Sequence, residues 1–185
     1  MTGSFTAVGG RKVPGALIGT DCILDGVRVM RHLYEVDGWG VGEVWTRGDV
    51  VVQHVLASYG LEGRAAPGTP RLVAELCRRF SRHLGGRAVA YEDVLLDLEW
   101  ATPFQQALAA ALRAVPWGEV VSYGELAALA GRPGAARAAG SFCADNRYAL
   151  IVPCHRVVAA GGIGGYGTSG VELKRRLLAL EGVRL

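Results

Sequence analysis

A cysteine and a histidine stand side by side in Pro153-Cys154-His155, and together they could supply a nucleophile and a base. The apolar residues 150–152 precede them, which is typical of a buried strand that Pro153 ends. A cysteine at a rigid strand end is well placed to attack, and a nearby histidine favours the thiolate, the reactive form. A buried structural cysteine is the alternative, and it is the more common role of a single cysteine.

The adjacency of Cys154 and His155 argues against a cysteine protease. Consecutive side chains on extended backbone point to opposite faces, and a protease takes its histidine from a distant part of the chain. We therefore expect His155 to act on the thiol through a water molecule or across a turn.

A glycine-rich loop follows the cysteine. Six of the twelve residues in 159–170 are glycine, so this backbone can approach a ligand closely. No Gly-Lys-Ser/Thr triplet follows, which excludes a phosphate-binding P-loop.

Two short helices are predicted ahead of the cysteine, and they form a helix-turn-helix candidate. Ser122 and Glu125 have the spacing of a capping box, which begins a helix that continues through Leu129. The Gly/Pro turn 131–134 ends this helix, and a second one is predicted over about 135–143. Its small side chains would let its backbone lie against another surface, and plain helix-helix packing is the alternative.

The surrounding segments must position these residues. Apolar residues at helical spacing predict one helix over about 104–115 and a last one from near Val171, where the basic triplet Lys174-Arg175-Arg176 is interpreted as a solvated face. In the first half, strands are predicted between turn dipeptides such as Asp37-Gly38. The expected strands are 27–36, 41–45, 50–55 and 89–98, with a helix over 72–84.

These elements predict two domains. Residues 1–98 would be an α/β N-terminal domain, with a small antiparallel sheet and a helix, in which 1–15 are flexible. Residues 99–185 would be a mostly helical C-terminal domain with a winged-helix-like helix-turn-helix, which carries DNA binding and the alkyl acceptor discussed below.

Composition bounds the class of protein. Of the 185 residues, 50% are apolar and 20% charged, so a packed core is feasible and global disorder is excluded. No stretch approaches the roughly 18 uncharged apolar residues of a membrane span, and the N-terminus lacks the apolar core of a signal peptide. We therefore expect a cytoplasmic protein with no membrane partner.

Charge and cysteine usage add two expectations. The net charge is +3, and the whole basic excess lies in residues 98–185, which permits a phosphate-bearing partner. The four cysteines, at positions 22, 77, 143 and 154, form no C-x-x-C pair, so reduced thiols are expected.

Taken together, the motifs resemble those of the O6-alkylguanine-DNA alkyltransferases, also called methylated-DNA–protein-cysteine methyltransferases. The resemblance covers about residues 100–185, whereas residues 1–98 match only in general character. It rests on Pro153-Cys154-His155-Arg156-Val157, Asn146 eight positions earlier, and the segments 118–123, 126–131, 135–138, 164–167 and 177–182 in order.

The resemblance implies a single-turnover repair protein. Such a protein flips an alkylated guanine out of duplex DNA and moves the alkyl group from O6 irreversibly to its own cysteine, with O4-alkylthymine as a second substrate. It works as a monomer through the minor groove and needs no cofactor or metal. By the same resemblance Cys154 is the acceptor, and Glu181 orients His155, which takes the thiol proton through water. Asn146 would tie down the turn around the cysteine, and the Tyr123 hydroxyl would meet guanine N3.

The resemblance also implies the residues that bind substrate and DNA. The guanine pocket would be formed by Val157, Tyr166, Gly167 and Thr168. The DNA contacts would come from Arg137, Tyr123, Gly124, Arg132, Ala136 and Ala138, with Arg137 entering the base stack in place of the flipped base. Small residues on the second helix would permit close approach to the minor groove.

The sequence departs from the family pattern at three places. Arg147-Tyr148 follows Asn146 where a proline is common, which would loosen the segment and could add a DNA contact from Arg147. Leu108-Ala109 replaces a common Val-Trp pair, which affects packing and not chemistry. The loop 167–170 differs in length and residue type from some relatives, which leaves its tolerance of bulky alkyl groups open.

Three rival interpretations were weighed. A non-catalytic lesion-binding relative would lack the acceptor cysteine, and Cys154 is present. A transcriptional regulator of this type would need an additional Cys-rich zinc domain, for which 185 residues leave no room. A structural zinc in the first half is not expected, because its candidate ligands are not clustered in the sequence. Those candidates are Cys22, Cys77, His32, His54 and His83.

Overall fold

The structure is a computed structural model that describes residues 21–24, 27–59 and 69–185. The flexibility expected for residues 1–15 concerns residues outside this description. The described N-terminal half begins with a four-stranded antiparallel sheet whose strands pair in chain order. The strands are β1 (Asp21–Leu24), β2 (Val27–Val36), β3 (Gly40–Arg47) and β4 (Val50–Ser58). The hairpins predicted from the turn dipeptides are confirmed.

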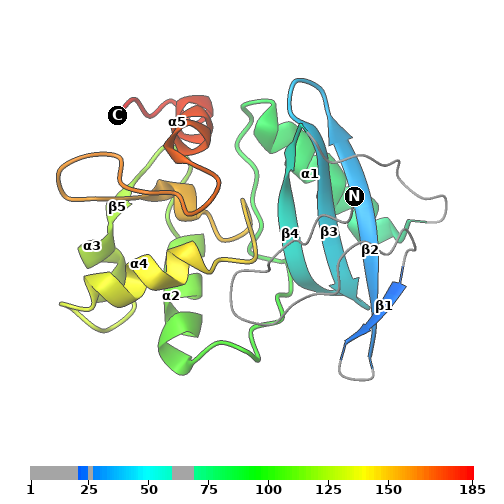
Figure 1. Cartoon of the computed structure of the whole chain (residues 1–185), viewed down its shortest axis with the longest axis horizontal. Helices are drawn as coiled ribbons and strands as arrows, with labels where there is room; N and C mark the ends of the chain where they lie inside the picture. The colour runs from blue at the N-terminus through cyan, green and yellow to red at the C-terminus, as the bar shows by residue number, and fades with distance from the viewer. Residues whose placement is uncertain (1–20, 25–26, 60–68) are drawn as a thin grey trace, which may run out of the picture.

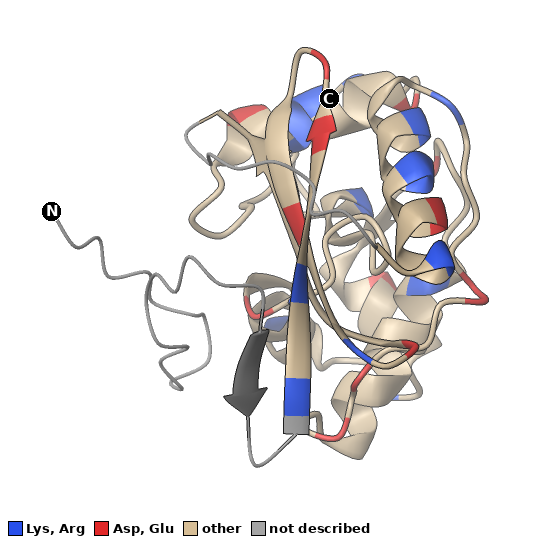
Figure 2. Ribbon diagram, turned by 90° about the vertical axis from the view of Figure 1, so that its right-hand side faces the viewer, with Lys and Arg blue, Asp and Glu red and all other residues tan. Residues whose placement is uncertain are grey.

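One helix, α1 (Arg71–Leu84), covers a face of this sheet (Figure 1). Its buried face includes Val73, Leu76 and Phe80, and the ring of Phe80 stacks on His54 of β4 with centroids 3.9 Å apart. Its outer face carries arginines, visible as a series of blue positions along the helix in Figure 2. The helix is therefore held by one apolar stripe, as its i+4 spacing predicts.

The expectation of a strand over 89–98 is wrong. This segment contains only an isolated bridge between Leu96 and Val51 of β4. The Val51 N–H donates to Leu95 O, and the Asp97 N–H donates to Val51 O, both at 2.9 Å. The segment pairs with the sheet at one residue only, since a turn at 92–93 interrupts it and a second turn at 99–100 follows it.

The C-terminal half is mostly helical, with one two-stranded parallel pair. Its elements are α2 (Pro103–Arg113), β5 (Val121–Ser122), α3 (Tyr123–Leu129), α4 (Ala136–Ala144), the 3₁₀ turn η1 (Cys154–Arg156), β6 (Val157–Val158) and α5 (Val171–Leu180). The helix-turn-helix expected from the capping box is formed by α3 and α4, which pack on each other and on α2 (Figure 1).

The two halves share one continuous hydrophobic core. It runs from Val44 and Phe80 beside the sheet to Leu108, Leu126 and Leu177 in the helical half. Main-chain bonds also cross the junction, because the N–H of His54 in β4 donates to Arg147 O at 2.8 Å. The sheet therefore supports the segment that leads into Cys154.

Candidate active site

The segment that ends at Cys154 is a series of tight turns, so the buried strand expected there is wrong. Leu150 has a positive φ of 66°, a backbone conformation that residues other than glycine adopt only at a cost in conformational energy. Short-range bonds close the turns: Ile151 N–H to Ala149 O and Val152 N–H to Tyr148 O, each 2.8 Å. The run is apolar because both halves of the molecule bury it, and not because it lies in a sheet.

Asn146 joins the two ends of this turn segment. Its Nδ2 donates to Val152 O at 2.7 Å and to Cys154 Sγ at 3.1 Å. Its Oδ1 accepts the N–H of Tyr148 at 3.0 Å. One amide side chain thus fixes the backbone before the cysteine and also contacts the sulfur, so the position of the thiol depends on it.

Cys154 is buried at the start of η1, with 8% of its surface exposed. Burial raises the pKa of its thiol, because a thiolate loses hydration there. Hydrogen bonds from Asn146 and Tyr166 and the nearby charge of Lys174 act in the opposite direction. Since the net shift is upward, the resting sulfur is a thiol, and a base must take its proton before it attacks.

His155 has the geometry of that base. Its Nε2 lies 2.8 Å from Glu181 Oε1, so this nitrogen carries the hydrogen and donates it to the carboxylate. Its Nδ1 is therefore the basic nitrogen, and no hydrogen-bond partner for it is found within the described part of the chain. Burial lowers the pKa of His155 to about 4, which keeps the ring neutral and able to accept a proton at neutral pH.

Glu181, just after α5, is the most heavily bonded group in the site. Arg156 donates from Nε to Oε2 and from Nη2 to Oε1, each at 2.9 Å, and the Gly118 N–H reaches Oε2 at 3.3 Å. Burial alone would raise the pKa of this carboxyl, but hydrogen bonds from the surrounding imidazoles and guanidinium hold it well below its usual range. Arg156 also donates to Val115 O at 2.6 Å, so it locks the carboxylate in place.

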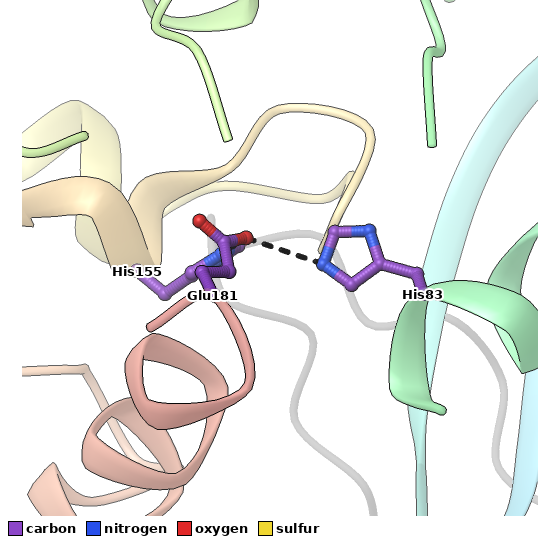
Figure 3. A group of neighbouring side chains, drawn as sticks. All are labelled: His83, His155 and Glu181. Atoms are coloured by element: carbon purple, nitrogen blue, oxygen red, sulfur yellow. Dashed lines mark hydrogen bonds and ion pairs between the residues drawn. The ribbon is translucent and has the colours of Figure 1, made fainter. Parts of the chain in front are cut away.

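Sequence reasoning missed the contribution of the N-terminal half. His83, at the end of α1, is fully buried and its Nε2 lies 3.4 Å from Glu181 Oε1 (Figure 3). His54 of β4 hydrogen-bonds to Ala149 O through Nδ1 and to the Tyr34 hydroxyl through Nε2 at 2.6 Å. Single histidines far from the motifs give no sequence signal, so neither contact could be predicted.

Tyr123 begins α3 directly after the capping box. The Ser122 side chain accepts the Glu125 N–H at 3.1 Å, and the Glu125 side chain accepts the Ser122 N–H at 2.6 Å, so the predicted box is confirmed. The ring of Tyr123 lies against Gly140 and Gly164, where an added Cβ would come within 3.9 Å and 3.5 Å of it. The half-buried ring of Tyr123 therefore lies within van der Waals range of both glycines, between α4 and the glycine-rich loop.

The helix-turn-helix presents the predicted DNA-binding residues on or near the surface. Arg137 and Ala138 of α4 are exposed, whereas Ala136 and Gly124 are half-buried. Arg132 lies in the turn between the helices, and its guanidinium sits 4.9 Å from the centroid of the Phe104 ring. Arg147, the departure from the family pattern, stacks on Trp100 at 4.4 Å.

The predicted pocket residues differ in burial. Val157 is buried in β6 opposite Val121, and Tyr166 is half-buried in the glycine-rich loop, where its hydroxyl acts to lower the pKa of the Cys154 thiol. Gly167 and Thr168 are exposed in the loop that follows.

Lys174 corrects the interpretation of the basic triplet as a solvated face. Arg175 and Arg176 are exposed, but Lys174 is fully buried, and its Nζ donates to Val157 O at 2.5 Å and to Gly165 O at 3.1 Å. Its ammonium therefore ties the glycine-rich loop to β6, close to Cys154.

The candidate zinc ligands of the N-terminal half do not form a group in the described residues. His32 bonds to Thr46 and His54 to Tyr34 and Ala149, while the side chain of Cys22 lies outside the description. The potential metal-binding group found in the described part of the chain is His83, His155 and Glu181.

No helix among the described residues has the length and apolar character needed to cross a bilayer.

Comparison with known sequences gives a consistent result. The family model described as "6-O-methylguanine DNA methyltransferase, DNA binding domain" matches residues 103–183. A methylated-DNA–protein-cysteine methyltransferase of Mycolicibacterium paratuberculosis is 35% identical over 166 residues, which span 89% of this chain and 84% of the relative. A protein of the same name from Mycobacterium bovis is 53% identical over 90 residues, or 48% of this chain and 53% of the relative.

Solved structures agree with the sequences. A crystal structure of Mycobacterium tuberculosis OGT in complex with DNA matches with a TM-score of 0.67 and 34% identity, over 82% of this chain and 92% of that one. The O6-methylguanine-DNA methyltransferase of Pyrococcus kodakaraensis matches with a TM-score of 0.52 and 28% identity, over 88% and 97% of the two chains. Since the similarity to the Mycolicibacterium paratuberculosis protein extends over most of both chains, this chain belongs to the methylated-DNA–protein-cysteine methyltransferase family.

Proposed function

We propose that this chain repairs DNA by direct reversal, transferring an alkyl group from O6 of guanine in duplex DNA to Sγ of Cys154. The observation that carries the proposal is a buried thiol, fixed by Asn146, next in the chain to a neutral imidazole that Glu181 orients. The new S–C bond forms as the C–O6 bond breaks, and the thioether is permanent. Each molecule therefore acts once, as a methylated-DNA–protein-cysteine S-methyltransferase.

The proton of the thiol goes to His155. Its Nδ1 has the free lone pair, and the Nε2–H···Glu181 bond of 2.8 Å stabilises the imidazolium that forms. A water molecule between Sγ and Nδ1 would complete this path. The guanine leaves as a neutral base once it gains one proton, so the proton that His155 takes from the thiol is balanced by one delivered to the base, and a hydrogen-bond donor at N3 assists that delivery. This chemistry has no step that needs a metal.

Guanine would be held between the cysteine turn and the glycine-rich loop. Tyr123 would donate its hydroxyl hydrogen to N3 of the base, and the backbone of Val157 would accept from the base edge. Tyr166 would form one wall, with Gly167 and Thr168 contributing backbone beside O6. The half-buried position of Tyr123 between Gly140 and Gly164 supports this pocket.

DNA would bind across α3 and α4 through the minor groove. The base must leave the stack before the thiol can reach it, and extrusion costs a few kcal/mol. Exposed Arg137 would enter the gap and offset part of that cost, while Ala136 and Ala138 allow close approach. Gly124 and Arg132 would contact the backbone, so binding should depend weakly on sequence.

Three finer features belong to the same proposal. O4-alkylthymine would be a second substrate, since its alkyl carbon can reach the same sulfur after flipping. The protein would act as a cytoplasmic monomer, with no metal. The boundary between an N-terminal domain and the DNA-binding and alkyl-acceptor domain would lie near residue 98.

The alternative is a lesion-binding protein without transfer activity, and the site does not favour it. Such a protein needs the pocket but not the proton relay, whereas Cys154, His155 and Glu181 are all present and connected.

The test is a single-turnover assay on duplex DNA containing O6-methylguanine. Lesion loss should plateau at one equivalent per protein and should be accompanied by restored guanine. Cys154→Ser should bind the same duplex without removing the lesion, whereas Cys77→Ser, remote from the site, should retain full stoichiometry. Binding by the parent chain with no loss of lesion would support the lesion-sensing alternative.

A further inference from the structure

We propose that His83 is a positioning residue for the alkyl transfer, which points its Nε2–H at Oε1 of Glu181 and limits how tightly that oxygen holds His155. The proposal rests on the proposed function, because it concerns the same proton relay. It assigns a role in the chemistry to the N-terminal half of the molecule.

The geometry of His83 is that of an oriented group. Its ring is fully buried, and its Nε2 faces Glu181 Oε1 at 3.4 Å (Figure 3). Its Nδ1 lies 3.4 Å from the Tyr91 hydroxyl. The ring also meets Trp117 edge-on, with centroids 4.8 Å apart. A hydroxyl that donates to Nδ1 leaves the hydrogen on Nε2, so the ring presents an N–H to the carboxylate.

The long distance of 3.4 Å between His83 Nε2 and Glu181 Oε1 follows from the other donors to this oxygen. Oε1 already accepts from His155 Nε2 at 2.8 Å and from Arg156 Nη2 at 2.9 Å, which use both of its lone pairs. His83 is therefore a third donor to a filled acceptor, and its Nε2 has no hydrogen-bond partner of ordinary length among the residues described. Buried polar atoms in this condition are few in native proteins, and catalytic sites are one place where they occur.

A third donor changes how strongly Oε1 of Glu181 stabilises protonated His155. The electron density of Oε1 is shared among its donors, so His83 weakens the stabilisation of protonated His155. The charged and titratable groups around His83 all bear on this balance. They are Glu181, Arg156, His155, Tyr91 and His54. Burial lowers the pKa of His83 and Arg156 lowers it further, while Glu181 raises it; the net shift is downward, so the ring is neutral at neutral pH.

A metal ion is the competing use of the same atoms. His83, His155 and Glu181 offer ligand atoms that lie within 4.8 Å of one another. However, Arg156 bonds to both carboxylate oxygens, and a divalent cation would lie beside its guanidinium in a buried setting. The charge of Arg156 therefore favours the positioning role.

The experiment compares His83→Leu with His83→Gln by single-turnover transfer rates between about pH 4 and pH 8. The leucine variant removes the donor, so the acid limb of the profile should move upward by roughly half to one unit, because Oε1 then holds protonated His155 more tightly. The glutamine variant keeps an N–H donor and should return the midpoint toward that of the parent. Leu76→Ala, buried on the same helix, is the control for lost stability alone.

Two results would overturn the proposal. One is a His83→Leu variant that melts earlier but has the pH midpoint of the parent, as Leu76→Ala should. The other is stabilisation by added Zn²⁺ in the parent that disappears in His83→Leu, which would assign the atoms to a metal. The pKa of His155 measured by NMR in the free protein should show the same upward shift. That measurement needs no substrate, so it separates failure of this proposal from failure of the alkyl-transfer function.

Discussion

At the scale of single residues, the site separates two tasks that many cysteine enzymes combine. Asn146 donates a hydrogen bond to the Cys154 sulfur, whereas the His155–Glu181 pair is the base that we propose for its proton. The thiol is buried and its pKa is raised, so it stays protonated at neutral pH. It should therefore react slowly with general alkylating agents unless a base removes its proton. A protein that can react only once gains from a nucleophile with low background reactivity.

Replacing Asn146 with alanine tests this separation. The change removes the bonds to Val152 O and Cys154 Sγ and leaves the buried Tyr148 N–H without its acceptor, Asn146 Oδ1, at a cost of about 1–3 kcal/mol. The thiol pKa should rise further, and transfer should slow by more than about tenfold. Rates of transfer and of iodoacetamide alkylation against pH measure both effects.

Tyr148→Phe is the matched control for that prediction. Tyr148 lies in the same segment, and its hydroxyl donates to Asp97 O instead of to the sulfur. The Tyr148→Phe substitution should lower the stability of the protein and leave the pKa of the Cys154 thiol unchanged. Equal effects of the two substitutions on the thiol pKa would mean that Asn146 acts only on the fold of the turn.

At the scale of elements, helix caps place the residues that meet the base and the DNA. Ser122 and Thr102 begin α3 and α2 with complete capping boxes, but only the first is next to a predicted site residue, Tyr123. Ser122→Ala and Thr102→Ala should each cost about 1 kcal/mol of stability. Only Ser122→Ala should also slow transfer, since it loosens the start of the helix at Tyr123. Thermal melts and single-turnover rates on both variants decide this; equal rates would contradict the account.

The role of α4 is tested with two substrates. Arg137→Ala should slow transfer from the duplex by more than about tenfold, because no side chain then fills the gap that the flipped base leaves in the stack. Transfer from the free base O6-methylguanine should be unchanged, since no duplex has to be opened. Arg175→Ala, an exposed arginine of α5, is the control and should leave both rates at parent values. A parallel loss on both substrates for Arg137→Ala would indicate damage to the pocket instead.

The sequence predicts elements better where the signal is local. The capping box Ser122–Glu125 and the Gly/Pro turn were sufficient to predict α3 and α4. The apolar run before Cys154 predicted a strand, and this prediction is wrong. A segment buried from both sides has an apolar sequence whether or not its backbone is extended. Leu150 in a left-handed conformation has no sequence signature at all.

At the scale of the whole molecule, the N-terminal half supports the site through two histidines. His54 bonds to the segment before Cys154, and His83 reaches Glu181 across about a hundred positions of sequence. Such long-range contacts between single residues cannot be predicted from periodicity or spacing. The burial of Lys174 is a further case, because the loop that it holds is placed by the fold and not by its neighbours in sequence.

The buried histidines predict acid lability. Burial lowers the pKa of both His54 and His155 to about 4, and it also lowers that of His83. The unfolded chain takes up these protons near pH 6.5, so it binds more protons than the folded state between about pH 6.5 and pH 4. Stability present above pH 6.5 should therefore be lost as the pH falls through this window.

Urea unfolding at several pH values measures this loss. Each unit of pKa difference is equivalent to about 1.4 kcal/mol, so the midpoint should fall steeply from pH 6.5 to pH 4.5. His54→Asn removes one titrating group and should flatten the slope. A midpoint independent of pH in this range would contradict the assignment of these rings as neutral and buried.

The central claim is that the alkyl group ends on Cys154, and its most direct test is intact mass followed by peptide mapping. After incubation with a duplex carrying O6-methylguanine, the parent should gain one methyl group per molecule, located on the peptide that contains Cys154. An unmodified duplex should produce no gain, and neither should Cys154→Ala with the lesion duplex. Cys143→Ser, which alters a half-buried thiol on α4, should still gain one methyl group. A methyl group found on Cys143 or Cys77, or a gain that persists in Cys154→Ala, would contradict the account.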